Sequence, residues 1–170
     1  MLEVNTIFKV EKEFIELIQA NSGIIHKICN VYFYKNPYKE DYYQEILIKL
    51  WNSFPTFKKQ SAFSTWLYQV ALNAAIDILR KEYIQPKYTE LTDKQYAIIS
   101  EDDDETDDKE RLYRAIHYLS DMEKAIILLY LDDYSYKDIS SITGLSENNI
   151  GVKINRIKNK LLEIIGNGKR

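Results

Sequence analysis

Apolar residues recur at helical spacing through most of this chain, and this pattern limits the fold more than any other feature of the sequence. The longest stripes occupy residues 24–32, 43–54, 63–79 and 150–164, with neighbours three or four positions apart. Such spacing places side chains on one face of an α-helix. A shorter helix is expected near residues 8–18. The sequence therefore predicts an all-α protein.

The periodicity fades in the middle of the chain, where the charge changes sharply. Seven of the eight residues at 101–108 are acidic, and adjacent like charges repel one another and bury no apolar surface. We therefore expect a flexible acidic linker at 84–110 between an N-terminal domain at 1–83 and a C-terminal domain at 111–170. The net charges are −7 for the linker and +1 and +3 for the two domains. The acidic average of the whole chain thus does not exclude binding to nucleic acid.

The two predicted domains differ in their helical pattern. Residues 1–83 hold about four of the expected helices, which is typical of a compact bundle. In residues 111–170, Ser120 and Glu123 form a capping-box pattern, and Ser135 starts a second short helix that ends at Gly144. Ser146 then caps a long helix. A short helix, a glycine turn and a capped second helix together predict a helix-turn-helix.

The second helix of a helix-turn-helix meets base edges with its first turns. Asparagine there can pair with adenine, lysine can reach guanine or phosphate, and basic residues further along meet phosphates. The candidate DNA-binding residues are Ser146, Asn148, Asn149, Lys153, Arg156 and Lys158. The alternative is a solvated amphipathic helix that packs on its neighbours; the capped glycine turn favours the DNA-binding interpretation.

Two segments resemble one protein family. Residues 40–81, with EDYYQEILIKLWNSF and FSTWLYQVALNAAIDILRK, resemble region 2 of the extracytoplasmic-function (ECF) sigma factors. Residues 134–162, YSYKDISSITGLSENNIGVKINRIKNKLL, resemble the region 4 helix-turn-helix of the sigma-70 family. The order is also that of the family, with region 2 first, a linker next and region 4 last. The resemblance implies a bacterial RNA polymerase sigma factor whose partners are core polymerase and promoter DNA.

The resemblance assigns one surface of the region 2-like segment to polymerase and the second helix of the helix-turn-helix to the −35 promoter element. In the family, the helix with the EDYYQE-like stretch binds the clamp coiled coil of the largest polymerase subunit, and the flap is a further expected contact. The polar residues implied are Glu40, Asp41, Gln44, Glu45 and Lys49. Each of them has an alternative interpretation as an ordinary residue on the solvent-exposed face of a bundle helix. The DNA-binding residues of the second helix would read the −35 element.

The resemblance assigns the −10 promoter element to the helix at 64–81 and to the loop at 55–62. Asn73 matches a family asparagine that touches a base flipped out of the duplex, and Arg80 and Lys81 would follow the phosphates. Phe57 and Phe63, at the edges of the loop, are the candidates for stacking on bases. Trp66 lies on the apolar stripe and is expected in the core.

Two features remain open at this point. The acidic linker can act as a polyanion in the RNA exit channel of polymerase, as the resemblance implies, or as a plain solvated tether. Gly151 stands where the family often has lysine, and a glycine inside a helix costs about 1 kcal/mol relative to alanine. It either permits close approach to DNA or marks weak −35 recognition aided by a recruiting partner.

Other functions are less well supported by the residues. A helix-turn-helix regulator that does not deliver polymerase explains only residues 111–165. A nuclease would need a metal site, and consecutive acids without glycine do not fix octahedral ligand geometry. We therefore expect no catalysis, cofactor or metal. The single cysteine, Cys29, is expected to be buried and unreactive. We see no membrane span or secretion signal and expect a cytoplasmic protein, with an anti-sigma factor as a further partner.

Overall fold

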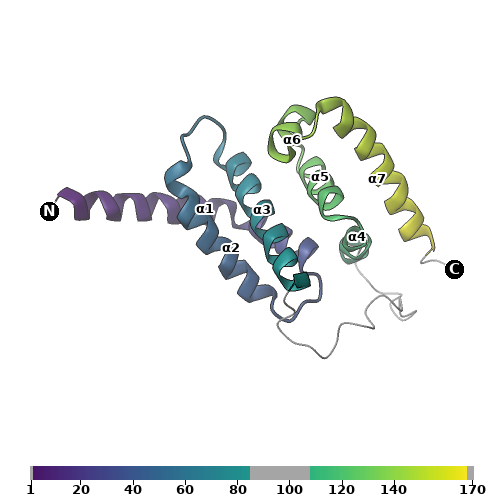
Figure 1. Cartoon of the computed structure of the whole chain (residues 1–170), viewed down its shortest axis with the longest axis horizontal. Coiled ribbons are helices and arrows are strands. Elements are labelled where there is room, and N and C mark those ends of the chain that lie inside the picture. The colour runs from purple at the N-terminus through teal and green to yellow at the C-terminus, as the bar shows by residue number, and fades with distance from the viewer. Residues whose placement is uncertain (1, 85–107, 168–170) are drawn as a thin grey trace. The chain divides into compact units, whose positions relative to one another are not determined.

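The computed structural model describes residues 2–84 and 108–167, which form seven α-helices, one short 3-10 helix and no strand (Figure 1). The elements are α1 (Leu2–Tyr32), α2 (Lys39–Ser53), η1 (Phe54–Thr56), α3 (Phe63–Ile84), α4 (Asp108–His117), α5 (Asp121–Leu131), α6 (Tyr136–Thr143) and α7 (Glu147–Asn167). The all-α prediction is confirmed. Within the described ranges, no helix is both long enough and apolar enough to span a membrane.

The chain divides into two compact units, residues 1–75 and 76–170, and the boundary falls inside α3. Most of the expected acidic linker, residues 85–107 with most of the acidic run, lies outside the described residues. At the edges of the expected linker, Ile84 belongs to α3 and residues 108–110 belong to α4. Both helices therefore extend further into this segment than the sequence predicted.

One continuous helix, α1, replaces the two helices expected at 8–18 and 24–32, so the first unit has three α-helices rather than about four. The segment Asn21-Ser22-Gly23 looks like a helix end in the sequence. In the structure, Asn21 Nδ2 donates a hydrogen bond to the Leu17 carbonyl at 2.8 Å, and Ser22 Oγ donates to the Gln19 carbonyl at 3.2 Å. These side chains bond back into the helix instead of ending it.

The core of the first unit is formed by residues of α1, α2 and α3, and α1 packs against α2. Ile25, Ile28, Ile46 and Leu50 are fully buried there. Burial of one such side chain contributes about 1.5–3 kcal/mol, so these residues account for much of the packing energy of the pair. The N-terminal part of α1 extends beyond the rest of the unit, where Phe8 is exposed (Figure 1).

Six aromatic side chains form an aromatic cluster at the end of α2 and the start of α3: Phe14, Trp51, Phe54, Phe57, Phe63 and Trp66. Phe54 is central, because its ring centre lies 5.1 Å from that of Phe14 and 6.1 to 6.3 Å from those of Phe57, Phe63 and Trp66. Pro55 follows it at the first turn of η1, where a missing N–H costs nothing. The cluster therefore fixes both ends of the loop between η1 and α3.

Cys29 is 2% exposed, as expected from the sequence. Burial raises the pKa of its thiol to about 12, the negative charge of Glu40 adds to this effect, and Lys39 opposes it. The residue is therefore a neutral thiol near pH 7 and packs as a small apolar side chain.

In the second unit, α7 packs against α4, α5 and α6. Its buried stripe consists of Ile150, Ile154, Ile157 and Leu161, at the alternating spacing seen in the sequence. Residues 124–129 of α5 are all buried, so this helix is covered on every side over that stretch. The second unit is thus built around α5, with α7 laid along it.

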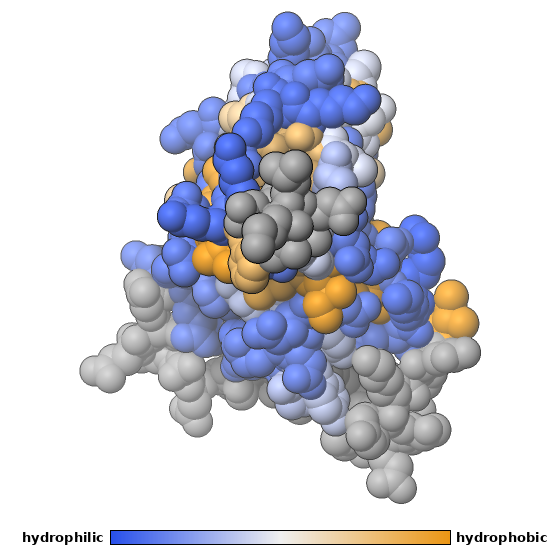
Figure 2. Space-filling view, turned by 90° about the vertical axis from the view of Figure 1, so that its left-hand side faces the viewer, coloured by the Kyte–Doolittle hydropathy of each residue, from blue (hydrophilic) through white to orange (hydrophobic). Residues whose placement is uncertain are grey.

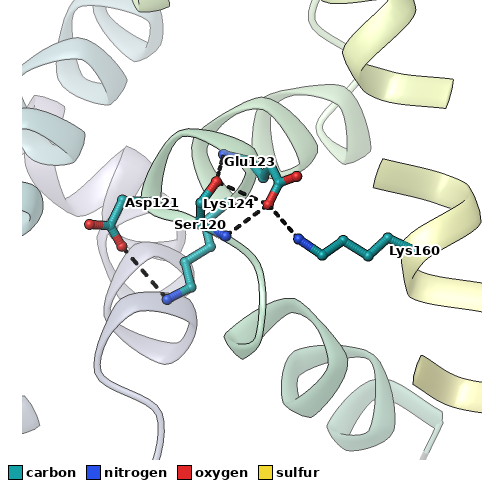
Figure 3. Close-up of polar contacts among 5 residues, drawn as sticks. All are labelled: Ser120, Asp121, Glu123, Lys124 and Lys160. Carbon is teal, nitrogen blue, oxygen red and sulfur yellow. Dashed lines mark hydrogen bonds and ion pairs between the residues drawn. The ribbon is translucent and has the colours of Figure 1, made fainter. Parts of the chain in front are cut away.

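The starts of α5 and α6 are capped as the sequence predicted. The backbone N–H of Ser120 donates to Glu123 Oε2 at 2.8 Å, and the N–H of Glu123 donates to Ser120 Oγ at 3.4 Å, which completes a capping box (Figure 3). Ser135 Oγ accepts from the N–H of Asp138 in the same way. Figure 3 also shows Lys160 of α7 reaching Glu123 Oε2 at 3.0 Å, so the cap ties α7 to α5.

This cap makes the stability of the second unit depend on pH. Burial raises the pKa of Glu123, but the hydrogen bonds from the Ser120 backbone and from Lys160 outweigh it and hold the pKa below its usual 4.5. The stabilisation is complete above pH 4.5 and is lost as the pH falls through the lowered pKa. Glu123→Gln should therefore be less stable than the original chain at pH 7, and the difference should shrink as the pH falls below 4.5. Thermal unfolding followed by circular dichroism checks this; a difference that stays constant with pH would contradict it.

Candidate nucleic-acid and protein interfaces

The second unit contains the helix-turn-helix that the sequence predicted. The helix α6 ends at Gly144, which has a φ of 75° and lies in the left-handed region. Glycine adopts this conformation without the steric cost that a side chain carries. Residues 144–146 then form the turn, and α7 begins at Glu147 and packs against α6. The first turns of α7 are placed as those of a recognition helix.

The structure separates the predicted DNA-binding residues of α7 into two groups. Asn148, Asn149 and Arg156 are exposed, as is Ser146 in the turn before the helix, and Lys153 is half-buried. Lys158 instead turns toward α5: its Nζ donates a hydrogen bond to Tyr130 Oη at 2.7 Å and lies 4.2 Å from the centre of that ring. This lysine contributes to packing within the unit.

Gly151 faces the start of α6 in this structure. A Cβ atom at this position would lie 3.4 Å from Cε2 of Tyr136, the first residue of α6, which is an ordinary van der Waals contact. An alanine would therefore fit here, and packing within the unit does not require the glycine.

Two exposed residues of α7 were not among those predicted from the sequence. Val152 is 51% exposed and Asn155 is also exposed. Neither is basic and neither lies in the first turn of α7, the two features on which the prediction rested. Their exposure could have been predicted from the buried stripe. Val152 and Asn155 each stand two positions before a residue of that stripe, and such a shift places them on the opposite face of the helix.

The outer face of α3 carries the residues expected at the −10 element. Asn73, Arg80 and Lys81 are exposed, and Trp66 is half-buried at the start of the helix. Asp77 is exposed between them and forms an ion pair with Arg80, with Nη1 3.5 Å from Oδ1. An exposed pair of this kind contributes little to stability. Its effect is to reduce the positive charge that this part of α3 offers to a phosphate.

Phe57 and Phe63 have different environments, although both were expected to stack on bases. Phe63 is 9% exposed and lies within the aromatic cluster, so its ring is a core residue in this structure. Phe57 is half-buried, with its ring centre 5.3 Å from that of Phe63 and 5.4 Å from that of Trp66. Of the two rings, Phe57 keeps an accessible part and a rigid support.

The loop between η1 and α3 is exposed and basic. Lys58 and Lys59 follow Phe57, and residues 58–62 are all exposed. Lys59 has a φ of 57°, a conformation that non-glycine residues adopt rarely, and its Nζ bonds to Glu13 Oε1 of α1 at 2.5 Å. The contact to α1 holds the loop beside Phe57 and leaves Lys58 as a second cation at the same edge.

The outer face of α2 carries the residues expected to bind polymerase. Glu40, Asp41, Gln44 and Lys49 are exposed, and Glu45 is half-buried. The structure adds Ile48, whose side chain is 60% exposed among them. Trp51 is 39% exposed on the same side of the helix. An apolar centre with a polar and charged rim is the usual composition of a protein interface.

The face drawn in Figure 2 shows how small the exposed apolar areas are. Hydrophilic residues cover most of it, and apolar residues form small separate patches among them. Patches of this size are ordinary on protein surfaces. Exposure of Ile48 alone therefore does not indicate a binding site; its place at the centre of a charged helix face does.

Comparison with known proteins identifies both halves of the chain. The model of Sigma-70 region 2 matches residues 17–83, and the model of Sigma-70 region 4 matches residues 109–161. The chain is 30% identical over 138 residues to the ECF RNA polymerase sigma-E factor of Haemophilus influenzae, covering 71% of this chain and 73% of that protein. It is 27% identical over 117 residues to the RNA polymerase sigma factor SigV of Bacillus subtilis, with coverages of 68% and 69%.

A solved structure supports the fold. The chain resembles the sigma factor RpoE crystallised in complex with the anti-sigma factor NepR from Bartonella quintana, with a TM-score of 0.65 and 22% identity. The match covers 92% of this chain and 96% of that one. With the helical order of the two units and the two region matches, these similarities show that the chain belongs to the ECF group of the sigma-70 family of RNA polymerase sigma factors.

Proposed function

We propose that this sigma factor binds core RNA polymerase through the outer face of α2 and promoter DNA through two further surfaces. The first DNA surface, for the −10 element, consists of the outer face of α3 and the loop before it. The second, for the −35 element, consists of the first turns of α7. The chain acts by binding and needs neither catalysis nor a cofactor of its own.

The observation that carries this proposal is the presence of a region 2 match and a region 4 match in one chain. A helix-turn-helix regulator accounts for the second unit only. It gives no reason for the α2 face, where Ile48 is exposed among charged residues. A protein that must hold polymerase and DNA at once needs both surfaces.

At the −10 element, we propose that Asn73 and Phe57 hold a base outside the duplex. Removing a base from the stack costs a few kcal/mol, which contacts in a pocket must offset. Stacking on an aromatic ring returns about 1–3 kcal/mol per base. Phe57 has the rigid support of Phe63 and Trp66 for this purpose, and Lys58 adds positive charge at the edge of the loop.

Titration of a fluorescently labelled chain with core polymerase tests the proposal against the regulator alternative. We expect a saturable rise in anisotropy with no DNA present, because the α2 surface binds protein. A chain that binds DNA but gives no rise with core polymerase would support the regulator instead. A variant with Glu40→Lys and Asp41→Lys is expected to bind core polymerase with lower affinity. Both positions are exposed, so the chain should stay folded.

The contrast between Arg156 and Lys158 gives a prediction for DNA binding. Arg156 is exposed, whereas Lys158 is bonded to Tyr130. Each phosphate contact contributes about 0.9 to the slope of log affinity against log salt concentration. Arg156→Ala should lower this slope by about 0.9 in holoenzyme–promoter binding. Lys158→Ala should leave the slope unchanged and lower the thermal stability; equal slopes for the two variants would contradict the assignment.

The proposed function also bears on how the chain is regulated and where it acts. A similar fold is known in a complex of a sigma factor with an anti-sigma factor, and we propose that a protein of that kind can cover the surfaces of this chain. Because its partners are polymerase and promoter DNA, we place the chain in the cytoplasm.

A further inference from the structure

We infer that α7 reads a short run of A·T base pairs in the −35 element, through Asn148, Val152 and Asn155. This inference rests on the proposed function and adds the base preference of its second DNA surface. It comes from a row of residues that we call the asparagine stripe: Asn148, Val152, Asn155 and Asn159.

The geometry of α7 places this stripe opposite the core. The buried stripe, Ile150 to Leu161, has spacings of four, three and four residues, and the asparagine stripe repeats them two positions earlier. Two positions correspond to about 200° around a helix, so the two rows lie on opposite faces. The three asparagines are exposed and Val152 is 51% exposed. The stripe is therefore the part of α7 that faces away from its own unit.

The length of the stripe matches the part of a recognition helix that enters the major groove. From Asn148 to Asn155 the helix rises about 10 Å, close to three base-pair steps of about 3.4 Å. A groove about 12 Å wide admits these turns. Asn159 lies about 6 Å further along the axis, beyond the turns that meet base edges. It is therefore a matched control for the other two asparagines.

The chemistry of the stripe favours A·T pairs. An asparagine amide pairs with N6 and N7 of adenine, and an apolar side chain contacts the methyl group of thymine. Guanine is read most often by arginine or lysine. No arginine precedes Arg156 in α7, and Lys153 lies half-buried at the side. The first turns of the helix thus carry partners for adenine and thymine at the positions that face the groove.

The other cations of α7 do not compete for the bases. Lys158 is bonded to Tyr130, and Lys160 is bonded to Glu123 at 3.0 Å. Both interactions hold these side chains against α5. Positive charge at the exposed face therefore comes mainly from Arg156, beyond the turns that carry Asn148 and Val152, where a phosphate contact would orient the helix without adding base preference.

The test uses core polymerase, the full chain and a template library in which the −35 region is randomised. Sequencing the transcripts from barcoded templates gives the base preference at each position. We expect A·T enrichment at about three adjacent base pairs. Asn148→Ala and Asn155→Ala should each relax the preference at one base pair by about 5- to 100-fold. Asn159→Ala should leave every preference unchanged, and Asn155→Arg should move one preference to G·C.

The outcomes distinguish this inference from the proposed function. Discrete starts with G·C enriched in the randomised region, or equal effects of Asn155→Ala and Asn159→Ala, would overturn the inference and leave the sigma-factor function standing. No dependence of transcription on the chain would overturn the proposed function and the inference with it. Circular dichroism of each variant checks folding; alanine at these exposed helix positions should not lower helical stability.

Discussion

Replacing Ile48 by lysine is expected to weaken binding to core polymerase by at least about 30-fold, the size of an interface hot spot. Ile48 is 60% exposed at the centre of the α2 face, where its burial against a partner would supply the apolar contact of the interface. A lysine there introduces a charge that the interface must desolvate. Because the side chain faces outward and lysine favours helices, the stability of the chain should change little.

The matched control is Ile15→Lys. Ile15 is also an isoleucine on a helix and is 53% exposed, but it lies on α1 and is not one of the residues of the proposed interface. Its replacement should leave the affinity for core polymerase unchanged. If the two variants bind equally well, α2 does not hold polymerase through this face. Anisotropy titrations of both variants, with thermal unfolding curves alongside, give the comparison.

The second large effect is expected in the aromatic cluster, where Phe54→Ala should destabilise the first unit by about 3–5 kcal/mol. Phe54 is 7% exposed and its ring contacts those of Phe14, Phe57, Phe63 and Trp66. Its removal leaves a cavity among rings that are held from several helices. The two tryptophans of the chain, Trp51 and Trp66, both lie in this cluster. Urea unfolding followed by tryptophan fluorescence therefore reports on the first unit alone.

Phe57→Ala separates the structural role of the cluster from its proposed contact with DNA. Phe57 is half-buried at the rim, so its loss should cost less stability than that of Phe54. If Phe57 stacks on a base, promoter opening should fall by about 5- to 100-fold in a chain that remains folded. Permanganate reactivity of thymines in the opened promoter measures this step. Normal opening by Phe57→Ala would exclude the stacking role.

Much of the fold could be predicted because local and global preferences agree. The cap residues Ser120, Glu123 and Ser135 and the turn at Gly144 fix helix ends by hydrogen bonds and backbone conformation that depend on only a few neighbouring residues. The stripe from Ile150 to Leu161 gives the direction of the core without knowledge of what covers it. The starts of α5 and α6 and the end of α6 followed from these features.

The errors in the fold have equally local causes. The segment at Asn21–Gly23 has the composition of a turn, but the side chains of Asn21 and Ser22 donate hydrogen bonds to carbonyls of the preceding turn, and the helix continues through it. Tyr42 and Tyr68 are fully buried, although tyrosine is intermediate in its preference for the interior. Trp66 was expected in the core because it lies on the apolar stripe, and it is instead half-buried in the aromatic cluster.

The candidate site was harder to predict than the fold, because exposure alone does not show what a side chain contacts. Lys158 and Arg156 are both basic and two positions apart, yet Lys158 bonds to Tyr130, 28 positions away in the sequence. Phe63 and Phe57 likewise differ only in how far the cluster covers them. Such differences depend on contacts between distant segments, which no local pattern contains.

Promoter-directed transcription in vitro tests the central claim most directly. Core polymerase and a library of supercoiled templates are combined with the chain, without it, and with Asn73→Ala, an exposed position on α3. We predict discrete starts that require the chain and that Asn73→Ala abolishes or reduces by about 10-fold or more, as expected for the loss of a contact to a flipped base. Starts that appear equally without the chain, or no starts in its presence, would contradict its role as a sigma factor.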